Sequence, residues 1–303
     1  MNRNDNNDNN LTALVSCFAR AYHYRESDVR VFSDEAAERL LRKEEFSAIA
    51  ENMRAGIAFF APDFQGSPEE SLRLITDRFL APPVLARSAF CEQALAEAAE
   101  KDGFSQYVLF GAGYDSFSIR CRMPNLTVYE LDLPERIKDK LARISPLRGP
   151  EHSPAFFLPC DLTQTDWIRA LTDSGFHSDK PAFGSLLGLC HYLTEAAFER
   201  LLQTIARAFA PASRIAFDYP LLVQKEALSK NRALAKGAGE PMRSAYSPEA
   251  MTALLSRCGF TVLQHADSHL LTETFFSAYN RANPEHLMQA PADSACCLAV
   301  RNE

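Results

Sequence analysis

The chain has 303 residues, of which 47% are hydrophobic and 23% charged, a balance typical of a folded protein with a core, so wholesale disorder is excluded. Acidic residues (39) outnumber basic ones (32), and the net charge of −7 argues against nucleic acid or an anionic membrane surface as a partner. No apolar stretch approaches the roughly 20 residues that cross a bilayer, so no membrane association is expected.

The first residues, 1–10, are almost entirely polar and contain no apolar segment of the kind found in a secretory signal. We therefore expect a disordered leader over residues 1–10. The eight cysteines are scattered through apolar segments without a C-x-x-C pair or zinc-ligand spacing. This pattern predicts buried, reduced thiols in a cytoplasmic protein and no metal site.

The segment 11–84 is predicted to be a helical extension or lid. Apolar residues recur at helical spacing, and Ser33 or Asp34 is suited to cap the second helix. The pair Pro82-Pro83 is expected to break the fourth helix before a fifth begins. The expected helices in and after this segment cover residues 11–24, 33–41, 45–60, 70–80 and 87–99.

After Gly103 the pattern changes to short apolar runs that alternate with helices. Thr194 and Ser247 are well placed to cap two of these helices. Parallel strands need crossover connections, so this alternation predicts an α/β, Rossmann-like domain over residues 85–303, with a mostly parallel sheet of seven strands and helices on both faces. The expected strands cover residues 107–110, 126–131, 155–158, 183–189, 214–217, 260–263 and 296–300.

A Gly111-Ala112-Gly113 turn follows the first expected strand, where glycine allows a sharp bend and a close approach of a ligand to the backbone. The second strand ends in acids at Glu130 and Asp132. Asp132 follows Gly113 by about 20 residues, the spacing at which an acid can accept hydrogen bonds from ribose hydroxyls. The pattern indicates a cofactor that contains adenosine.

Two cofactor classes fit this arrangement. The full dinucleotide pattern has a third glycine, and this sequence has Ser116 there. S-adenosyl-L-methionine carries no phosphate and needs no such close helix approach, and Arg87 offers a cation for its carboxylate. The residues therefore favour S-adenosyl-L-methionine, with a nicotinamide-dependent oxidoreductase as the alternative.

Several ordered blocks over residues 11–220 resemble the leucine carboxyl methyltransferase family, including its bacterial branch related to polyketide carboxyl O-methyltransferases. The blocks are VFSDEAAERL at 31–40, ARS at 86–88, GAGYDS at 111–116, YELDLP at 129–134, PCDL at 159–162 and LGLCHYL at 187–193. The resemblance implies a class I methyltransferase fold and an S-adenosyl-L-methionine-dependent O-methyltransferase of the EC 2.1.1 class.

The resemblance also implies roles for particular residues. Arg87 would bind the carboxylate of the cofactor, Asp132 the ribose and Asp161 the adenine amino group. Glu130 would support the strand end or share the ribose. The implied cofactor-binding set is Arg87, Gly111, Ala112, Gly113, Glu130, Asp132, Asp161, Leu162 and Leu187.

One departure concerns Leu187, which stands where the family has an acid that faces the cofactor ammonium. A leucine side chain neither accepts hydrogen bonds nor offsets positive charge. This departure keeps open a protein that binds S-adenosyl-L-methionine but is catalytically altered or inactive.

The acceptor is expected to be a carboxylate of a small molecule or of a peptide end. A carboxylate is already ionised at neutral pH and needs no general base, which suits a sequence without an evident catalytic triad. The substrate-side candidates are Tyr192, His191, Arg120 and Arg20. If the acceptor is a phenol or an alcohol, His191 is the candidate base. The identity of the acceptor and the oligomeric state stay open.

Overall fold

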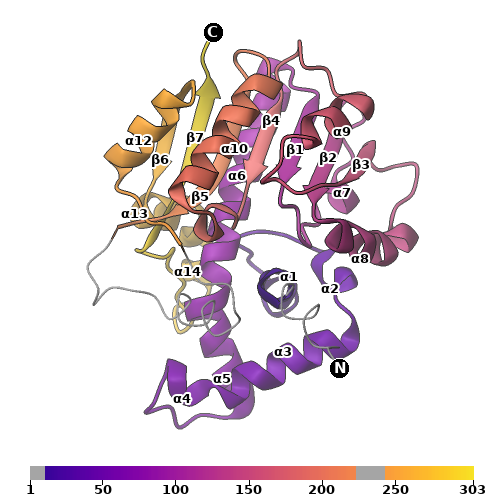
Figure 1. The fold of residues 1–303 in the computed structure, drawn as a ribbon. Coiled ribbons are helices and arrows are strands. Elements are labelled where there is room, and N and C mark those ends of the chain that lie inside the picture. Colours follow the sequence, from indigo (N-terminus) through magenta and orange to yellow (C-terminus); the bar gives the residue numbers. More distant parts are fainter. Residues whose placement is uncertain (1–10, 223–242) are drawn as a thin grey trace, which may run out of the picture.

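The computed structural model describes residues 11–222 and 243–303, which form a sheet covered by helices on both faces (Figure 1). The strands are β1 (Gln106–Phe110), β2 (Thr127–Asp132), β3 (Ala155–Pro159), β4 (Phe183–Leu186), β5 (Arg214–Pro220), β6 (Phe260–Ala266) and β7 (Ser294–Arg301). Their order is β3-β2-β1-β4-β5-β7-β6, and β7 runs antiparallel to both of its neighbours. The predicted Rossmann-like class I methyltransferase fold, with its mostly parallel sheet of seven strands, is confirmed.

Each predicted strand is present, but the fourth ends earlier than expected. β4 stops at Leu186, because Gly188 takes a φ of +65° and turns the chain away from the sheet. Glycine adopts this left-handed backbone without strain. The apolar residues after Leu186, which the sequence pattern assigned to the strand, instead form the wall of a pocket.

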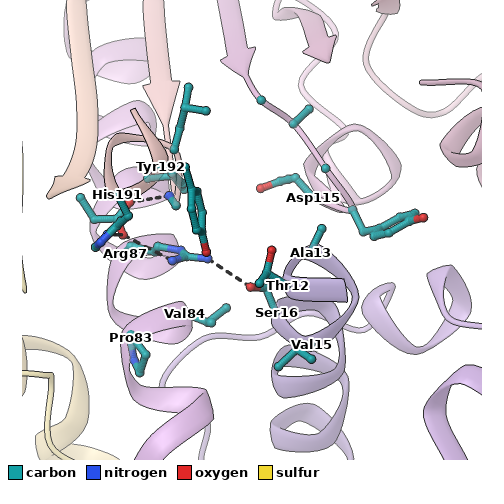
Figure 2. A pocket seen from close by; sticks show the side chains of 18 of the residues that line it. Thr12, Ala13, Val15, Ser16, Pro83, Val84, Arg87, Asp115, His191 and Tyr192 are labelled. Atoms are coloured by element: carbon teal, nitrogen blue, oxygen red, sulfur yellow. Dashed lines mark hydrogen bonds and ion pairs between the residues drawn. The ribbon is translucent and has the colours of Figure 1, made fainter. Parts of the chain in front are cut away.

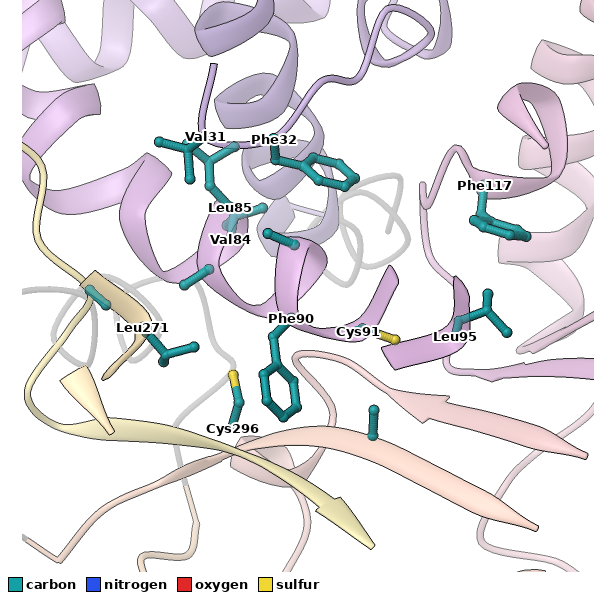
Figure 3. Close-up of a cluster of buried hydrophobic side chains, with 14 of the residues drawn as sticks. Val31, Phe32, Val84, Leu85, Phe90, Cys91, Leu95, Phe117, Leu271 and Cys296 are labelled. Atoms are coloured by element: carbon teal, nitrogen blue, oxygen red, sulfur yellow. The ribbon is translucent and has the colours of Figure 1, made fainter. Parts of the chain in front are cut away.

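The strands divide their side chains between two cores. Tyr107 and Leu109 of β1 face α6 (Ala81–Asp102) and α7 (Phe117–Arg120), whereas Val108 and Phe110 face the opposite helices. Figure 3 shows the first of these cores, with side chains of α6 packed above the strands. The helices on the second face are α9 (Trp167–Asp173), α10 (Glu195–Ala208) and α12 (Pro248–Arg257).

The two predicted helix caps in this domain are confirmed. The side chain of Thr194 accepts a hydrogen bond from the Ala197 N–H at the start of α10. Ser247 accepts one from the Ala250 N–H at the start of α12. All eight cysteines are free and buried, as the sequence predicted.

The N-terminal helices lie beside the edge of the sheet where the parallel strands end, with α1 nearest to that edge and α3, α4 and α5 farther out (Figure 1). They are α1 (Leu11–Glu26), α2 (Ala37–Leu40), α3 (Lys43–Ala55), α4 (Ile57–Phe60), α5 (Pro68–Ile75) and the π-helix η2 (Thr76–Leu80). The remaining elements are α8 (Pro134–Ile144), η3 (Ser145–Leu147), η4 (Cys190–Tyr192), α13 (Ser268–Leu271), η6 (Thr272–Phe276) and α14 (Ser277–Ala282).

Two local predictions in this segment are wrong. Pro82 and Pro83 do not separate two helices, because both lie in the first turn of α6, where a missing N–H costs nothing. The second helix is not capped by Ser33 or Asp34: its N-cap is Ala36, and the Asp34 side chain is buried in an ion-pair network. α6 also runs across the expected boundary between residues 84 and 85, and that division of the chain stays a prediction.

The expected disordered leader, residues 1–10, lies outside the described residues. Within the described ranges, no helix combines the length and the apolar character needed to cross a membrane.

Candidate functional site

A pocket of about 610 Å³ opens at the carboxyl ends of the parallel strands. The strand order reverses between β1 and β4, and such a reversal point is where open α/β sheets bind their ligands. The volume is in the range of pockets that hold cofactors and small ligands. Most of the predicted site residues line it: Arg20, Arg87, Gly111, Ala112, Gly113, Asp132, Asp161, Leu162, Leu187, His191 and Tyr192.

The glycine turn after β1 forms the floor of the pocket. Gly111 has a φ of +69° and Gly113 a φ of +47°, both in the region that favours glycine. A Cβ on Gly111 would lie 3.2 Å from the Cδ1 of Leu189. Both glycines line the pocket, so the bare backbone there leaves a groove that a ligand can approach closely.

Asp132 closes this groove at the end of β2. Its Oδ2 accepts a hydrogen bond of 2.7 Å from the Gly113 N–H, and its Oδ1 accepts one of 2.8 Å from the Leu133 N–H. Arg136 lies 3.7 Å from Oδ1. The acid is thus fixed relative to the glycine turn, as the spacing of the two motifs predicted.

Asp161 and Leu162 lie next to this acid, after β3. Asp161 Oδ1 accepts hydrogen bonds from the backbone N–H and the hydroxyl of Thr163, which hold the turn in shape. Leu162 is half-buried and packs against the core between the sheet and α10. These two residues form the far wall of the pocket beside Asp132.

Two predicted residues lie outside the pocket lining. Glu130 is completely buried and pairs with the ammonium of Lys140 at 2.5 Å. Arg120 contacts Glu92 and Asp34, and its Nε donates to the Ser116 hydroxyl at 2.9 Å. The structure therefore places Glu130 as a support of β2 and Arg120 in an internal ion-pair network.

Arg20 lines the pocket, but its guanidinium is already bonded to other groups of the protein. Its Nε donates to Asp34 at 2.8 Å, and its Nη2 donates to the Tyr114 carbonyl at 2.6 Å. Only 7% of the residue is exposed. Arg20 thus fixes α1 to the segment that follows the glycine turn.

Arg87 belongs to a cluster that the sequence did not reveal. Its Nη1 lies 3.3 Å from Asp218 Oδ2, and its Nη2 lies 3.3 Å from the Ser16 hydroxyl (Figure 2). Asp218 Oδ2 also accepts from His191 Nε2 at 2.9 Å, and Oδ1 accepts from the Gly188 N–H at 2.6 Å. Asp218 lies on β5 and is 4% exposed.

The charge of Asp218 is stabilised by these neighbours. Burial by itself would raise the pKa of its carboxyl, but the Arg87 guanidinium, the His191 ring and the Gly188 N–H together hold that pKa well below its usual range. A sequence signal was available, because an acid directly follows the expected strand 214–217. It was missed because no spacing rule links it to the glycine turn.

The first helix forms the opposite wall. Thr12, Ala13, Val15 and Ser16 of α1 face the pocket across from Arg87 and His191 (Figure 2). Within the described part of the chain, no group of three or more potential metal ligands gathers at one place.

Comparison with known proteins identifies relatives of this arrangement. The model of the leucine carboxyl methyltransferase family matches residues 13–206. A Bacillus subtilis protein, YktD, provisionally assigned as an S-adenosyl-L-methionine-dependent methyltransferase, is 34% identical over 285 residues, which are 89% of this chain and 92% of that protein. A Mycobacterium ulcerans protein with the same assignment is 31% identical over 212 residues, which cover 69% of this chain and 62% of its own length.

Solved structures share the fold. A protein from Thermobifida fusca, described provisionally as a methyltransferase, matches with a TM-score of 0.56 and 15% identity over 96% of this chain and 94% of its own. A Streptomyces avermitilis protein of the DUF574 family matches with a TM-score of 0.59 and 12% identity over 95% and 97% of the two chains. At these identities the likeness concerns the fold alone.

Proposed function

Given that the chain belongs to the leucine carboxyl methyltransferase family, whose members depend on S-adenosyl-L-methionine, we propose that it methylates a carboxylate of a small molecule or of a peptide end. Family membership also decides between the two cofactor classes in favour of S-adenosyl-L-methionine. The proposal concerns the methyl acceptor and the roles of individual residues.

The pocket fits this cofactor on chemical grounds. The glycine turn lines the pocket with backbone that carries no Cβ, and Asp132 is fixed beside it as an acceptor for ribose hydroxyls. Asp161 and Leu162 would receive the adenine. Arg87, on the other side of the reversal point, would bind the carboxylate as a charge-assisted pair.

The observation that carries a carboxylate acceptor is the arrangement of His191. Its Nε2 is bonded to Asp218, and its Nδ1 is buried without a hydrogen-bond partner among the described residues. Neither nitrogen is therefore presented to the pocket to remove a proton. A hydroxyl acceptor needs such a base, whereas a carboxylate is already ionised at neutral pH.

The residues of this chain would act by positioning and by excluding water. When bound, the cofactor supplies an electrophilic methyl group on a sulfonium. The apolar side chains that line the pocket keep water away and hold the acceptor in line: Leu11, Val15, Met53, Leu80, Pro83 and Val84. Correct placement of two reactants can by itself supply much of the rate enhancement.

The test uses the full-length protein with S-adenosyl-L-methionine and three matched panels: carboxylic acids, phenols and aliphatic alcohols. Formation of S-adenosylhomocysteine is followed together with base-labile methyl esters in the product. We expect turnover with members of the carboxylate panel and an ester product. Methyl transfer only to hydroxyl groups would contradict the proposal, and binding without turnover on all panels would favour a non-catalytic protein, the possibility that Leu187 raises.

A further inference from the structure

Asp218 has not been assigned a role in the proposed function. We propose that Asp218 is a positioning residue that holds Arg87 in place for the carboxylate of the cofactor, an inference that rests on the proposed role of Arg87.

An arginine that binds a ligand carboxylate has to be held against its own side-chain entropy, which is among the largest of any residue. Arg87 is held at two points, by Asp218 at Nη1 and by Ser16 at Nη2. These contacts leave further N–H groups of the guanidinium available to a ligand. A guanidinium that is already fixed loses less entropy when the ligand binds.

Asp218 is itself fixed from the other side. The Gly188 N–H and His191 Nε2 both donate to its carboxylate, so its orientation is set before it meets Arg87. Gly188 and His191 follow β4 and Asp218 lies on β5, so these groups meet on the same side of the reversal point. His191 therefore belongs to the support of Asp218.

Gly188 provides a second way to test the same contact. A Cβ on this residue would lie 2.9 Å from Arg87 Nη2 and 3.0 Å from its Cζ. Replacement of Gly188 by alanine retains the Asp218 carboxylate but crowds the guanidinium, and at a φ of +65° it also strains the backbone whose N–H donates to Asp218. Asp218→Asn thus removes the charged partner of Arg87, whereas Gly188→Ala crowds its guanidinium.

The experiment measures binding by isothermal titration calorimetry with three ligands. They are S-adenosylhomocysteine, its des-amino analogue, which keeps the carboxylate, and 5′-methylthioadenosine, which lacks the amino acid part altogether. We expect Asp218→Asn to raise the dissociation constants of both carboxylate-bearing ligands by about tenfold or more. The dissociation constant of 5′-methylthioadenosine should change by less than about twofold. Gly188→Ala should give the same pattern.

The control is Asp102→Asn. Asp102 pairs with Arg214, at the other end of β5, at 2.8 Å, and this acid–arginine pair is remote from the pocket lining. This variant should bind all three ligands as the wild type does. Thermal unfolding of each variant shows that the protein is folded before titration.

Three results would overturn the inference. Equal weakening for all three ligands would mean that Asp218 supports the fold alone. Weakening confined to S-adenosylhomocysteine would mean that Asp218 contacts the ammonium directly. Unchanged affinities in both variants would mean that Arg87 is not held by this cluster. No methyl acceptor is needed, so the outcome is independent of whether a carboxylate is the true substrate.

Discussion

The carboxylate of Asp132 receives two backbone N–H groups and still faces the pocket. We expect Asp132→Ala to weaken S-adenosylhomocysteine binding by about 1–3 kcal/mol, because a buried charged acceptor is lost. Asp132→Asn retains one acceptor oxygen and should lose less. Calorimetry on both variants provides the measurement, and an unchanged dissociation constant in Asp132→Ala would remove this residue from the ribose site.

His191 gives a second prediction at this scale. A glutamine in its place keeps an amide donor for Asp218, so we expect His191→Gln to lower turnover by less than about tenfold and to preserve the shape of the pH–rate profile. A general base would behave differently, since its removal costs about 100-fold or more and removes its own pKa from that profile. Steady-state rates across a pH series distinguish the two.

Contacts between site residues could be predicted where the two residues are a fixed number of positions apart on adjacent strands. Contacts between residues far apart in the sequence could not. The glycine turn and Asp132 belong to adjacent parallel strands, so their distance along the chain determines their meeting. Arg87 and Asp218 are separated by most of the domain, and their pairing depends on how α6 crosses the sheet. Glu130 shows the converse: it shares a face of β2 with Asp132, but it lies two residues before the end of the strand, where Lys140 of α8 pairs with it outside the pocket lining.

At the scale of elements, the strands and the caps of α10 and α12 were predicted well because each depends on a local pattern. The two prolines before Arg87 were misread because proline ends a helix or begins one depending on where the preceding turn stops. Here η2 leads directly into α6, and the prolines occupy the first turn of the new helix. Tertiary packing, which the local sequence does not encode, decides this alternative.

The cap of α10 carries a prediction about stability. Thr194→Ala should lower the free energy of unfolding by about 1 kcal/mol, because the Ala197 N–H loses its acceptor. Thr194→Ser keeps the hydroxyl and serves as the control. Urea unfolding followed by circular dichroism measures both, and equal stability of the alanine and serine variants would contradict the role of the cap.

A buried acid on η2 predicts a pH dependence. Burial raises the pKa of Asp77 to about 6, although Arg73 and the Tyr279 hydroxyl partly oppose the shift. The folded carboxyl therefore holds its proton more tightly than the unfolded one, and its contribution to the free energy of unfolding falls as the pH rises from about 4 to about 6. The change is about 3 kcal/mol at most.

Asp77→Asn removes this titration. The free energy of unfolding of the variant minus that of the wild type should therefore be larger at about pH 7.5 than at about pH 4.5. Chemical unfolding at the two pH values measures the difference. A relative stability that does not change with pH, or that changes in the opposite direction, would show that the Asp77 carboxyl is not held protonated by burial.

At the scale of the whole molecule, the N-terminal helices are joined to the sheet domain by a buried ion-pair network. Asp34 is fully buried and binds Arg20 of α1 at 2.8 Å, Arg120 of α7 at 3.2 Å and the Ser116 hydroxyl at 2.6 Å. Burial by itself would raise the pKa of Asp34, but the two arginines outweigh it and lower that pKa. The network makes the N-terminal segment part of the pocket wall.

Removal of the central acid should therefore be costly. We expect Asp34→Ala to lower the free energy of unfolding by about 3–5 kcal/mol, because two buried guanidinium groups lose the carboxylate that they share. Glu38→Ala, an exposed acid on the neighbouring α2, is the control and should have little effect. Thermal and chemical unfolding measure both, and similar small losses would mean that the network is not a structural link.

At the reversal of strand order between β1 and β4, the pocket has two walls that come from different parts of the sequence. Residues 106–162 supply the wall assigned to the nucleoside, whereas the wall on the other side combines α1, the start of α6 with Arg87, the segment after β4, and β5. On the proposed assignments, changes in the second wall can alter the acceptor while recognition of the nucleoside is retained. Chimeras between members of the family can therefore exchange residues 106–162 as one block.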